Sequence, residues 1–210
     1  MFEWISNYST ALQITLGILT LGVWYFYGHI LKASYDRKRR PRVLINKGLG
    51  TLHLDSPCLI CNMSSDSIYV LCLIAELETS EGTFTAQVTH YEMEEGGQTS
   101  RLSTRQQPID SGQCMRIRHF RELVTRAAEA GNIAVQDGLP QDDGVVFRSL
   151  AVTAICMYSS EDQPFGTERG FDLDCSRKST PRLIPVESDA KRLVSRKDRK
   201  KVATWLRRYT

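Results

Sequence analysis

The longest hydrophobic segment of the chain covers residues 11–31, ALQITLGILTLGVWYFYGHIL. About 20 apolar residues at a rise of 1.5 Å form a helix of roughly 30 Å, the thickness of the hydrocarbon core of a bilayer. The polar residues Gln13 and His29 lie near its two ends, and Trp4 and Trp24 suit the two membrane interfaces. A long helix buried in a soluble domain would show polar breaks that give it a wet face, and this segment lacks them. The pattern therefore predicts one transmembrane helix over residues 11–31.

Basic residues follow the predicted helix, whereas only the acidic Glu3 carries a charge before it. Lys and Arg beside a span remain in the cytoplasm, so the N-terminus is expected outside and the rest of the chain in the cytosol. A cleaved signal peptide fits poorly, because the first residues carry no positive charge and no small-x-small cleavage site follows the apolar segment. The basic residues behind the helix are Lys32, Arg37, Lys38, Arg39, Arg40 and Arg42.

After residue 42 the hydrophobic runs become short and are separated by turn-forming residues, which is typical of β-strands. The run 68–77 is too short to cross a bilayer as a helix, and it is predicted to be a central strand buried on both faces. Residues 83–90 alternate between apolar and polar, which predicts a half-buried strand that pairs with this strand as a hairpin. Residues 92–107 are polar and Gly-rich, which predicts a loop with at most a short edge strand. Further strands are predicted at 43–45, 58–61, 113–118, 145–158 and 170–174.

Two later segments show helical periodicity. Phe120, Leu123 and Val124 fall on one helical face, and Gly131 is placed to end that helix. Near the C-terminus, Ser195 and the acidic residue three positions later resemble a capping box. It precedes a narrow apolar stripe formed by Val202, Ala203, Trp205 and Leu206, whose opposite face is densely basic.

These elements predict a mainly β fold. The fold class is one N-terminal transmembrane helix, followed by a cytosolic antiparallel β-sandwich or barrel with one inserted helix and a basic C-terminal helix. The expected organisation is a short external N-terminus (1–10), the transmembrane helix (11–31), a basic juxtamembrane linker (32–42), the cytosolic β domain (43–187) and the basic amphipathic helix (188–210).

Charge is segregated along the chain, although the net charge is only +3 over 210 residues. Residues 43–190 carry 12 Lys/Arg and 21 Asp/Glu, a net charge of −9, whereas the two flanks together carry 15 Lys/Arg and 3 Asp/Glu, a net charge of +12. The body of the domain is therefore acidic and its two ends are basic.

The chain contains six cysteines. A cytosolic location predicts that they are reduced, so they are expected to act in packing or through their reactivity. Cys72 and Cys156 lie in apolar runs and are interpreted as small core residues. Cys58 and Cys61 have a C-x-x-C spacing, but in a strand they would point to opposite faces, and no second pair completes a zinc ribbon.

Signatures of nucleotide binding and catalysis are absent from the sequence. There is no G-x-x-x-x-G-K loop and no G-x-S-x-G elbow, and the four histidines are scattered without metal-ligand spacing. The sequence therefore predicts no catalytic residue, no cofactor and no metal site.

Two basic regions are candidate contacts with an anionic surface. Lys and Arg can bind nucleic acid phosphates or anionic lipid headgroups, but a domain tethered beside a leaflet meets lipid at high effective concentration. We therefore expect membrane lipid rather than nucleic acid as the partner. The alternative is a solvated helix packed on the acidic body through its apolar stripe. The candidate residues are Arg37, Lys38, Arg39, Arg40, Arg42, Arg196, Lys197, Arg199, Lys200, Lys201, Arg207 and Arg208.

Two resemblances extend these expectations. The order of apolar span, RKRRPRVLINKG and LICNMSSDSIYVLCLIAEL resembles bacterial single-pass inner-membrane proteins of unassigned activity with a cytosolic β domain. This resemblance implies a fold and an inner-membrane location, with the N-terminus outside and the domain cytosolic.

The second resemblance is to PilZ domains, β-barrels that bind cyclic di-GMP through R-x-x-x-R and, further on, D/N-x-S-x-x-G. Lys38-x-x-x-Arg42 and Asn62-x-Ser64-x-x-Ser67 lie at a similar separation. Lys38 stands where the family has an arginine whose planar fork grips the ligand, and Ser67 stands where it has glycine. This resemblance implies a ligand site at Lys38, Arg42, Asn62 and Ser64.

The sequence thus favours a non-enzymatic, membrane-anchored module that binds an unidentified protein partner or associates with itself, as an accessory subunit or scaffold. The alternative is a membrane-tethered ligand sensor with degenerate PilZ-like binding of a cyclic dinucleotide.

Overall fold

The computed structural model describes residues 2–38, 41–48, 53–95, 98–117, 119–142, 144–159, 163–175 and 181–209. The chain divides into two compact units, Met1–Arg40 and Pro41–Thr210.

The first unit is a single helix, α1 (Phe2–Lys38). Between Ala11 and Tyr35 this helix is long and apolar enough to cross a membrane, and none of that stretch is buried inside the chain. A signal sequence near the N-terminus would share these properties. Thr15 and Thr20 donate their hydroxyl protons to Ala11 O and Leu16 O within the helix, so both hydroxyls are satisfied without water. The predicted apolar N-terminal helix is confirmed.

The second unit contains two antiparallel sheets, which we name sheet A and sheet B. Sheet A has the strand order β1-β2-β8, with β1 (Val43–Lys47), β2 (Cys58–Asn62) and β8 (Cys114–Ile117). Sheet B has the order β13-β12-β11-β3-β4, and β14 pairs with β12 and β7 with β3. The strands of sheet B are β3 (Ile68–Thr79), β4 (Thr83–Gln87), β7 (Pro108–Ile109), β11 (Phe147–Tyr158), β12 (Phe165–Asp174), β13 (Arg182–Pro185) and β14 (Lys191–Leu193).

The two long strands β3 and β11 form the centre of sheet B. They pair from Ile68 with Tyr158 to Thr79 with Phe147. Successive side chains of a strand point to opposite faces, yet the neighbours Leu73 and Ile74 are both fully buried. Sheet B is therefore covered on both faces, and the prediction for residues 68–77 is confirmed.

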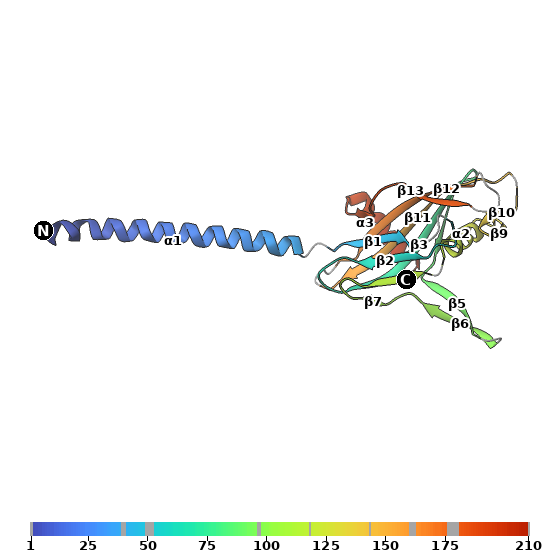
Figure 1. Ribbon diagram of the computed structural model, residues 1–210, viewed down its shortest axis with the longest axis horizontal. Helices are drawn as coiled ribbons and strands as arrows, with labels where there is room; N and C mark the ends of the chain where they lie inside the picture. Colours follow the sequence, from blue (N-terminus) through green and yellow to red (C-terminus); the bar gives the residue numbers. More distant parts are fainter. Residues whose placement is uncertain are drawn as a thin grey trace. The chain divides into compact units, whose positions relative to one another are not determined.

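Different elements cover the two faces of sheet B (Figure 1). The main core lies on the face that meets sheet A and α2 (Phe120–Glu129), and it joins Ile45 and Ile60 of sheet A, Leu73 of sheet B and Leu123 of α2. A second cluster lies on the opposite face, where α3 (Arg196–Tyr209) packs. The predicted antiparallel, mainly β architecture is confirmed at this level.

The predicted helix at residue 120 is present as α2. No side chain caps its N-terminus at His119. Instead, the first free N–H groups of the helix, those of Phe120 and Arg121, donate to Ser56 O and Leu54 O at 3.0 and 2.9 Å. The loop before β2 thus holds the start of the helix against the sheet.

The C-terminal helix α3 begins with the predicted capping box. Ser195 N–H donates to Asp198 Oδ2, and Asp198 N–H donates to Ser195 Oγ, each at 3.1 Å. Val202 is buried in the second cluster and packs close to Gly166 of β12, where a Cβ atom would lie 2.8 Å from Val202 Cγ2. Glycine at this position therefore permits the close approach of helix and sheet.

The polar stretch 92–107 differs from its prediction as a loop. It contains most of an antiparallel hairpin formed by β5 (His90–Glu95) and β6 (Gln98–Thr104), which extends away from the sheets in Figure 1. Backbone pairing across a hairpin does not require apolar side chains, so hydrophobicity gave no signal. A further two-stranded hairpin joins β9 (Val135–Gln136) and β10 (Leu139–Pro140).

The predicted strand 83–90 is also shorter in the structure. β4 ends at Gln87, because the hydroxyl of Thr89 accepts the Leu73 N–H at 2.9 Å and takes the place of a ladder partner. His90 then begins β5.

The packing of α3 can be tested through Trp205, a buried tryptophan in the second cluster. We expect Trp205→Ala to lower the free energy of unfolding by about 3 kcal/mol, because it leaves a large cavity between helix and sheet. Thr204→Ala, at an exposed position of the same helix, is the control and should change it by less than about 0.5 kcal/mol. Urea unfolding of the detergent-solubilised full-length protein measures both, and equal effects would contradict the packing of α3.

Candidate functional site

The outward face of α3 carries six of the twelve predicted basic residues. Its inward side is fixed by Val202 and Trp205, which are buried against sheet B. The helix therefore turns its opposite side to solvent. Six exposed basic side chains lie there: Arg196, Lys197, Arg199, Lys200, Arg207 and Arg208.

Lys201 is placed differently from these six. Its Nζ lies 2.8 Å from Glu76 Oε2 and 3.3 Å from Glu168 Oε2, and 4.4 Å from the centre of the Trp205 ring. Burial lowers the pKa of Lys201, but the hydrogen bonds and charges of Glu76 and Glu168 outweigh this effect and raise it. Lys201 thus fastens α3 to sheet B and is not part of the solvent-facing set.

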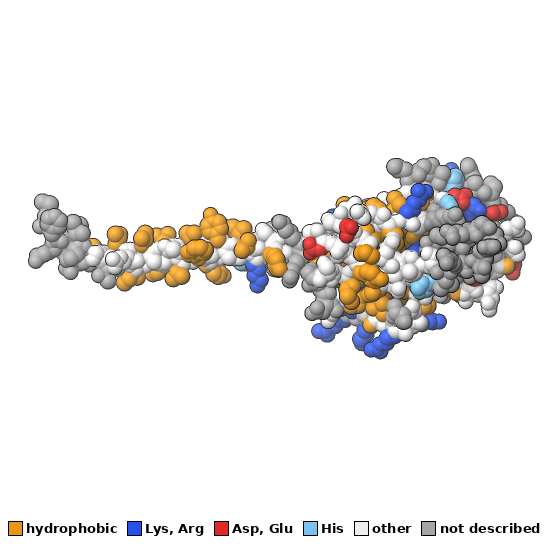
Figure 2. All heavy atoms as spheres, turned by 90° about the horizontal axis from the view of Figure 1, so that it is seen from below, with side chains coloured by type: hydrophobic (Ala, Val, Ile, Leu, Met, Phe, Trp, Pro, Cys, Tyr) orange, Lys and Arg blue, Asp and Glu red, His pale blue; other side chains and the backbone are white. Residues whose placement is uncertain are grey.

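The six outward cations form an uncompensated basic face. Within the part of the chain that the structure describes, no ion pair joins any of them to a carboxylate. Figure 2 shows blue side chains gathered along one margin of the domain, next to an exposed hydrophobic patch. We call the six residues the basic face.

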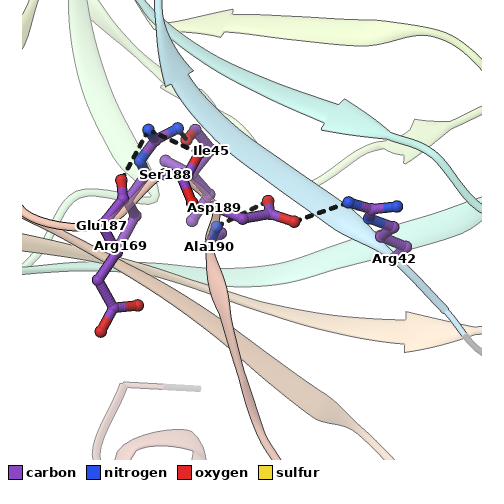
Figure 3. A network of polar contacts seen from close by, with 7 residues as sticks. All are labelled: Arg42, Ile45, Arg169, Glu187, Ser188, Asp189 and Ala190. Carbon is purple, nitrogen blue, oxygen red and sulfur yellow. Dashed lines mark hydrogen bonds and ion pairs between the residues drawn. The ribbon is translucent and has the colours of Figure 1, made fainter.

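The basic linker behind α1 is described only in part. Arg42 is ordered by an ion pair of 2.7 Å between its Nη2 and Asp189 Oδ2, and the hydrogen bond from Arg42 lowers the pKa of the Asp189 carboxyl (Figure 3). The Arg42 side chain remains 69% exposed, so this pair contributes little stability. The side chains of Arg37 and Lys38, and all of Arg39 and Arg40, lie outside the described residues.

A buried guanidinium lies beside this ion pair. Arg169 of β12 donates through Nη1 to Ile45 O, and through Nη2 to Glu187 O at 3.2 Å and Ser188 O at 3.3 Å (Figure 3). It thereby joins sheet B to β1 of sheet A and to the segment that carries Asp189. No sequence pattern indicates this role, because the three acceptors are backbone carbonyls remote from Arg169 along the chain.

The residues of the PilZ-like motif are brought together in part. Ser64 Oγ accepts the Arg42 N–H at 2.8 Å, and Asn62 Oδ1 accepts the Ser64 N–H at 2.9 Å. The Asn62 amide donates to Asp66 O and Ile109 O. Asn62 and Ser64 are buried, so their hydrogen-bonding groups hold the turn between β2 and β3 against the start of β1. The Lys38 side chain lies outside the described residues.

The same turn marks the attachment end of the domain, the end at which the chain arrives from α1. The N–H of Met63 donates to Arg42 O at 2.8 Å, and Tyr69 pairs across the strands with Met157 and Pro108. Met63, Tyr69 and Met157 are 58%, 43% and 37% exposed. Sequence reasoning did not single out these residues, because each lies within or beside an apolar run that otherwise forms core.

The cysteines correct one expectation. Cys61 and Cys114 lie opposite each other on β2 and β8 and form a disulfide, so the prediction that all six cysteines are reduced is wrong for this pair. The sequence could not show it, because the partner is 53 residues away. Cys58 points into the core instead, as the strand geometry predicts for a C-x-x-C spacing.

Three of the four remaining cysteines are buried core residues. Cys72 and Cys156 are fully buried, as predicted. Burial raises the pKa of Cys58 and Cys156 to about 12, so both remain protonated and unreactive near neutral pH. Within the described residues, no cluster of His, Cys, Asp or Glu is arranged to hold a metal ion.

Comparison of the chain with protein-family models, with curated proteins and with solved structures gives no match. Its function is therefore argued from its own surfaces.

The role of Arg169 can be tested by removing its donors. Arg169→Met should lower the free energy of unfolding by about 3 kcal/mol, because it leaves buried carbonyl groups without partners. Arg169→Lys should restore only part of this loss, since a single ammonium cannot reproduce the planar fork. Arg148→Met, at an exposed position of β11, is the matched control and should be nearly neutral. Chemical unfolding followed by circular dichroism measures all three, and a neutral Arg169→Met would contradict the role assigned to this network.

Proposed function

We propose that the chain is a single-pass, membrane-anchored module without enzymatic activity, whose β domain faces the cytosol and binds another protein strand to strand. The partner is a second copy of the chain or a protein to which it is an accessory subunit. The observation that carries the proposal is the open edge of sheet B at β4.

The hydrogen-bond pattern shows which groups of β4 are available. The N–H of Val88 donates to Leu73 O at 2.9 Å, so Val88 and Leu73 are a hydrogen-bonded pair. Such pairs alternate along antiparallel strands, which directs the N–H and C=O groups of Thr83, Thr85 and Gln87 away from β3. No backbone hydrogen bond from another described residue reaches them.

The composition of β4 suits the addition of a partner strand. Phe84 and Ala86 pack on the main core from one face of the strand, which fixes it in place. Thr83 and Thr85 lie on the other face and have high β propensity. No charge or proline blocks the edge within Thr83–Gln87, although such residues are a common protection of edge strands. A second copy confined to the same membrane would meet this edge at high effective concentration.

Anchoring and orientation are supported by α1 and its flanking charges. The basic residues behind the helix favour a cytosolic domain. The Cys61–Cys114 disulfide favours a domain on the opposite side of the membrane, because disulfides persist in oxidising compartments. However, β1, β2 and β8 also pair through their backbones, so the fold of sheet A does not require the disulfide. The flanking charges therefore decide the proposed orientation.

Orientation is tested by adding trypsin to sealed vesicles of either sidedness that contain the full-length protein. The basic face should be cleaved in inverted vesicles and protected in right-side-out vesicles. Cleavage in right-side-out vesicles together with protection in inverted vesicles would reverse the proposed orientation.

The strand edge is tested with Thr85→Pro, which removes an outward N–H without removing a hydrogen bond to β3. We expect the homo-oligomer or stoichiometric partner that purifies with the native protein in mild detergent to be lost. Thr85→Val keeps the N–H and should retain it. Thr83→Lys places a charge at the edge and should weaken it.

Circular dichroism establishes that each of these variants is folded. The proposal fails if a folded Thr85→Pro protein retains the same assembly, or if the native protein is a monomer without a partner.

The ligand-sensor alternative stays a prediction. Arg42, Asn62 and Ser64 share one network, but the polar groups of Asn62 and Ser64 bind within the chain.

A further inference from the structure

We infer that the basic face of α3 and the apolar residues of the attachment end form one surface, which binds the anionic headgroups and the outer acyl region of the leaflet beside the domain. This inference depends on the anchoring proposed above, but not on the protein partner. Three features favour lipid as the ligand of this surface: its composition, its continuity and the short linker that joins the domain to the anchor.

The apolar part of the surface consists of Tyr69 and Met157, which are 43% and 37% exposed. Tyr69 lies between Ile68 and Val70, which point into the main core, so it points to the opposite side of sheet B, the side on which α3 packs. Met157 is its cross-strand partner. A flexible thioether and an amphipathic phenol both suit the boundary between headgroups and acyl chains.

The basic part is continuous with the apolar part. Tyr69 lies near the start of β3 and Glu76 near its end. Because Lys201 contacts Glu76, the side of α3 that carries Lys201 faces away from Tyr69. At 100° per residue, Leu206 lies about 140° and Arg199 about 160° around the helix from Lys201, on the side toward Tyr69, whereas Lys197 and Arg208 lie within about 40° of Lys201. Leu71, between Tyr69 and the second cluster, is half-buried and links the two parts.

The linker keeps this surface near the membrane. Only residues 39–42 lie between the end of α1 at Lys38 and the start of β1 at Val43. The helix continues about 10 Å past residue 31, the end of the expected span, so the attachment end is tethered within about 30 Å of the leaflet.

Charge favours an anionic leaflet over a neutral one. Each Lys or Arg close to such a leaflet strengthens binding about five-fold. Asp66 and Asp110 are exposed at the same end and oppose this attraction. The other four cations of the basic face, Arg196, Arg199, Lys200 and Arg207, outnumber them, so the net attraction depends on α3.

The test uses the full-length protein in nanodiscs, with a fluorophore on Thr204→Cys, an exposed position of α3, and with nitroxide-labelled lipid headgroups as quencher. We expect strong quenching in discs that contain phosphatidylglycerol, weak quenching in discs of neutral phosphatidylcholine, and loss of quenching at high salt. Equal quenching in the two kinds of disc would overturn the inference.

Matched variants separate the two parts of the surface. Arg199→Gln/Arg207→Gln should lower the ratio of docked to free domain about twenty-fold in anionic discs. Arg116→Gln/Arg148→Gln removes two exposed charges from other strands and should leave the ratio within about two-fold, given screening. Tyr69→Ser/Met157→Ser should lower it in every lipid mixture. Identical losses in the two arginine pairs would overturn the inference.

Two further outcomes keep this test apart from that of the proposed function. If an oligonucleotide displaces the label from anionic discs at a concentration where inorganic phosphate does not, the basic face is a nucleic acid site and the lipid assignment is wrong. If the protein remains inserted in the disc but shows no lipid-dependent quenching, only the present inference fails, because the anchor is intact.

Discussion

The structure of the second unit depends on the burial of sheet B from both sides. Leu73 and Ile74 are adjacent in β3, point to opposite faces and are both fully buried. Sheet A and α2 provide one cover, and α3 provides the other. Removing α3 would expose Cys72, Ile74 and Ile155 to water, so the helix is part of the core rather than an appendage. The location of the basic face is thus decided by hydrophobic packing on the opposite side of the same helix.

The sequence predicts elements well where hydrophobic periodicity is strong. The central strand at residues 68–77, the helix at residue 120 and the capped C-terminal helix all show clear periods and are present. The hairpin of β5 and β6 was missed, because its pairing relies on backbone groups that every sequence possesses. Strand ends are least predictable where a side chain replaces a backbone hydrogen-bond partner of the neighbouring strand. The Thr89 hydroxyl does so after β4, where it accepts the Leu73 N–H.

The candidate site was predictable in composition but not in arrangement. Basic residues of α3 can be counted in the sequence, yet the inward position of Lys201 depends on Glu76 and Glu168, which only the fold brings together. Cys61 meets Cys114 through the register of β2 and β8, a relation between distant segments. The N–H donors of Arg169 bind backbone carbonyl groups, which every residue possesses, so no sequence pattern marks the acceptors. Local patterns therefore give the chemical groups present, and strand register decides which of them meet.

Gly166 has a consequence for how freely this chain can vary. A Cβ atom there would lie 2.8 Å from Val202 and 2.9 Å from Leu193, so any larger residue would force Val202 of α3 and Leu193 of β14 to shift. Exchanges between Lys and Arg on the outer side of α3 preserve the charge of the helix and do not change its packing on sheet B. Mutational drift should consequently be tolerated among the exposed charges but not at Gly166 beneath them. The charged surface is in this sense constrained by a residue that has no side chain.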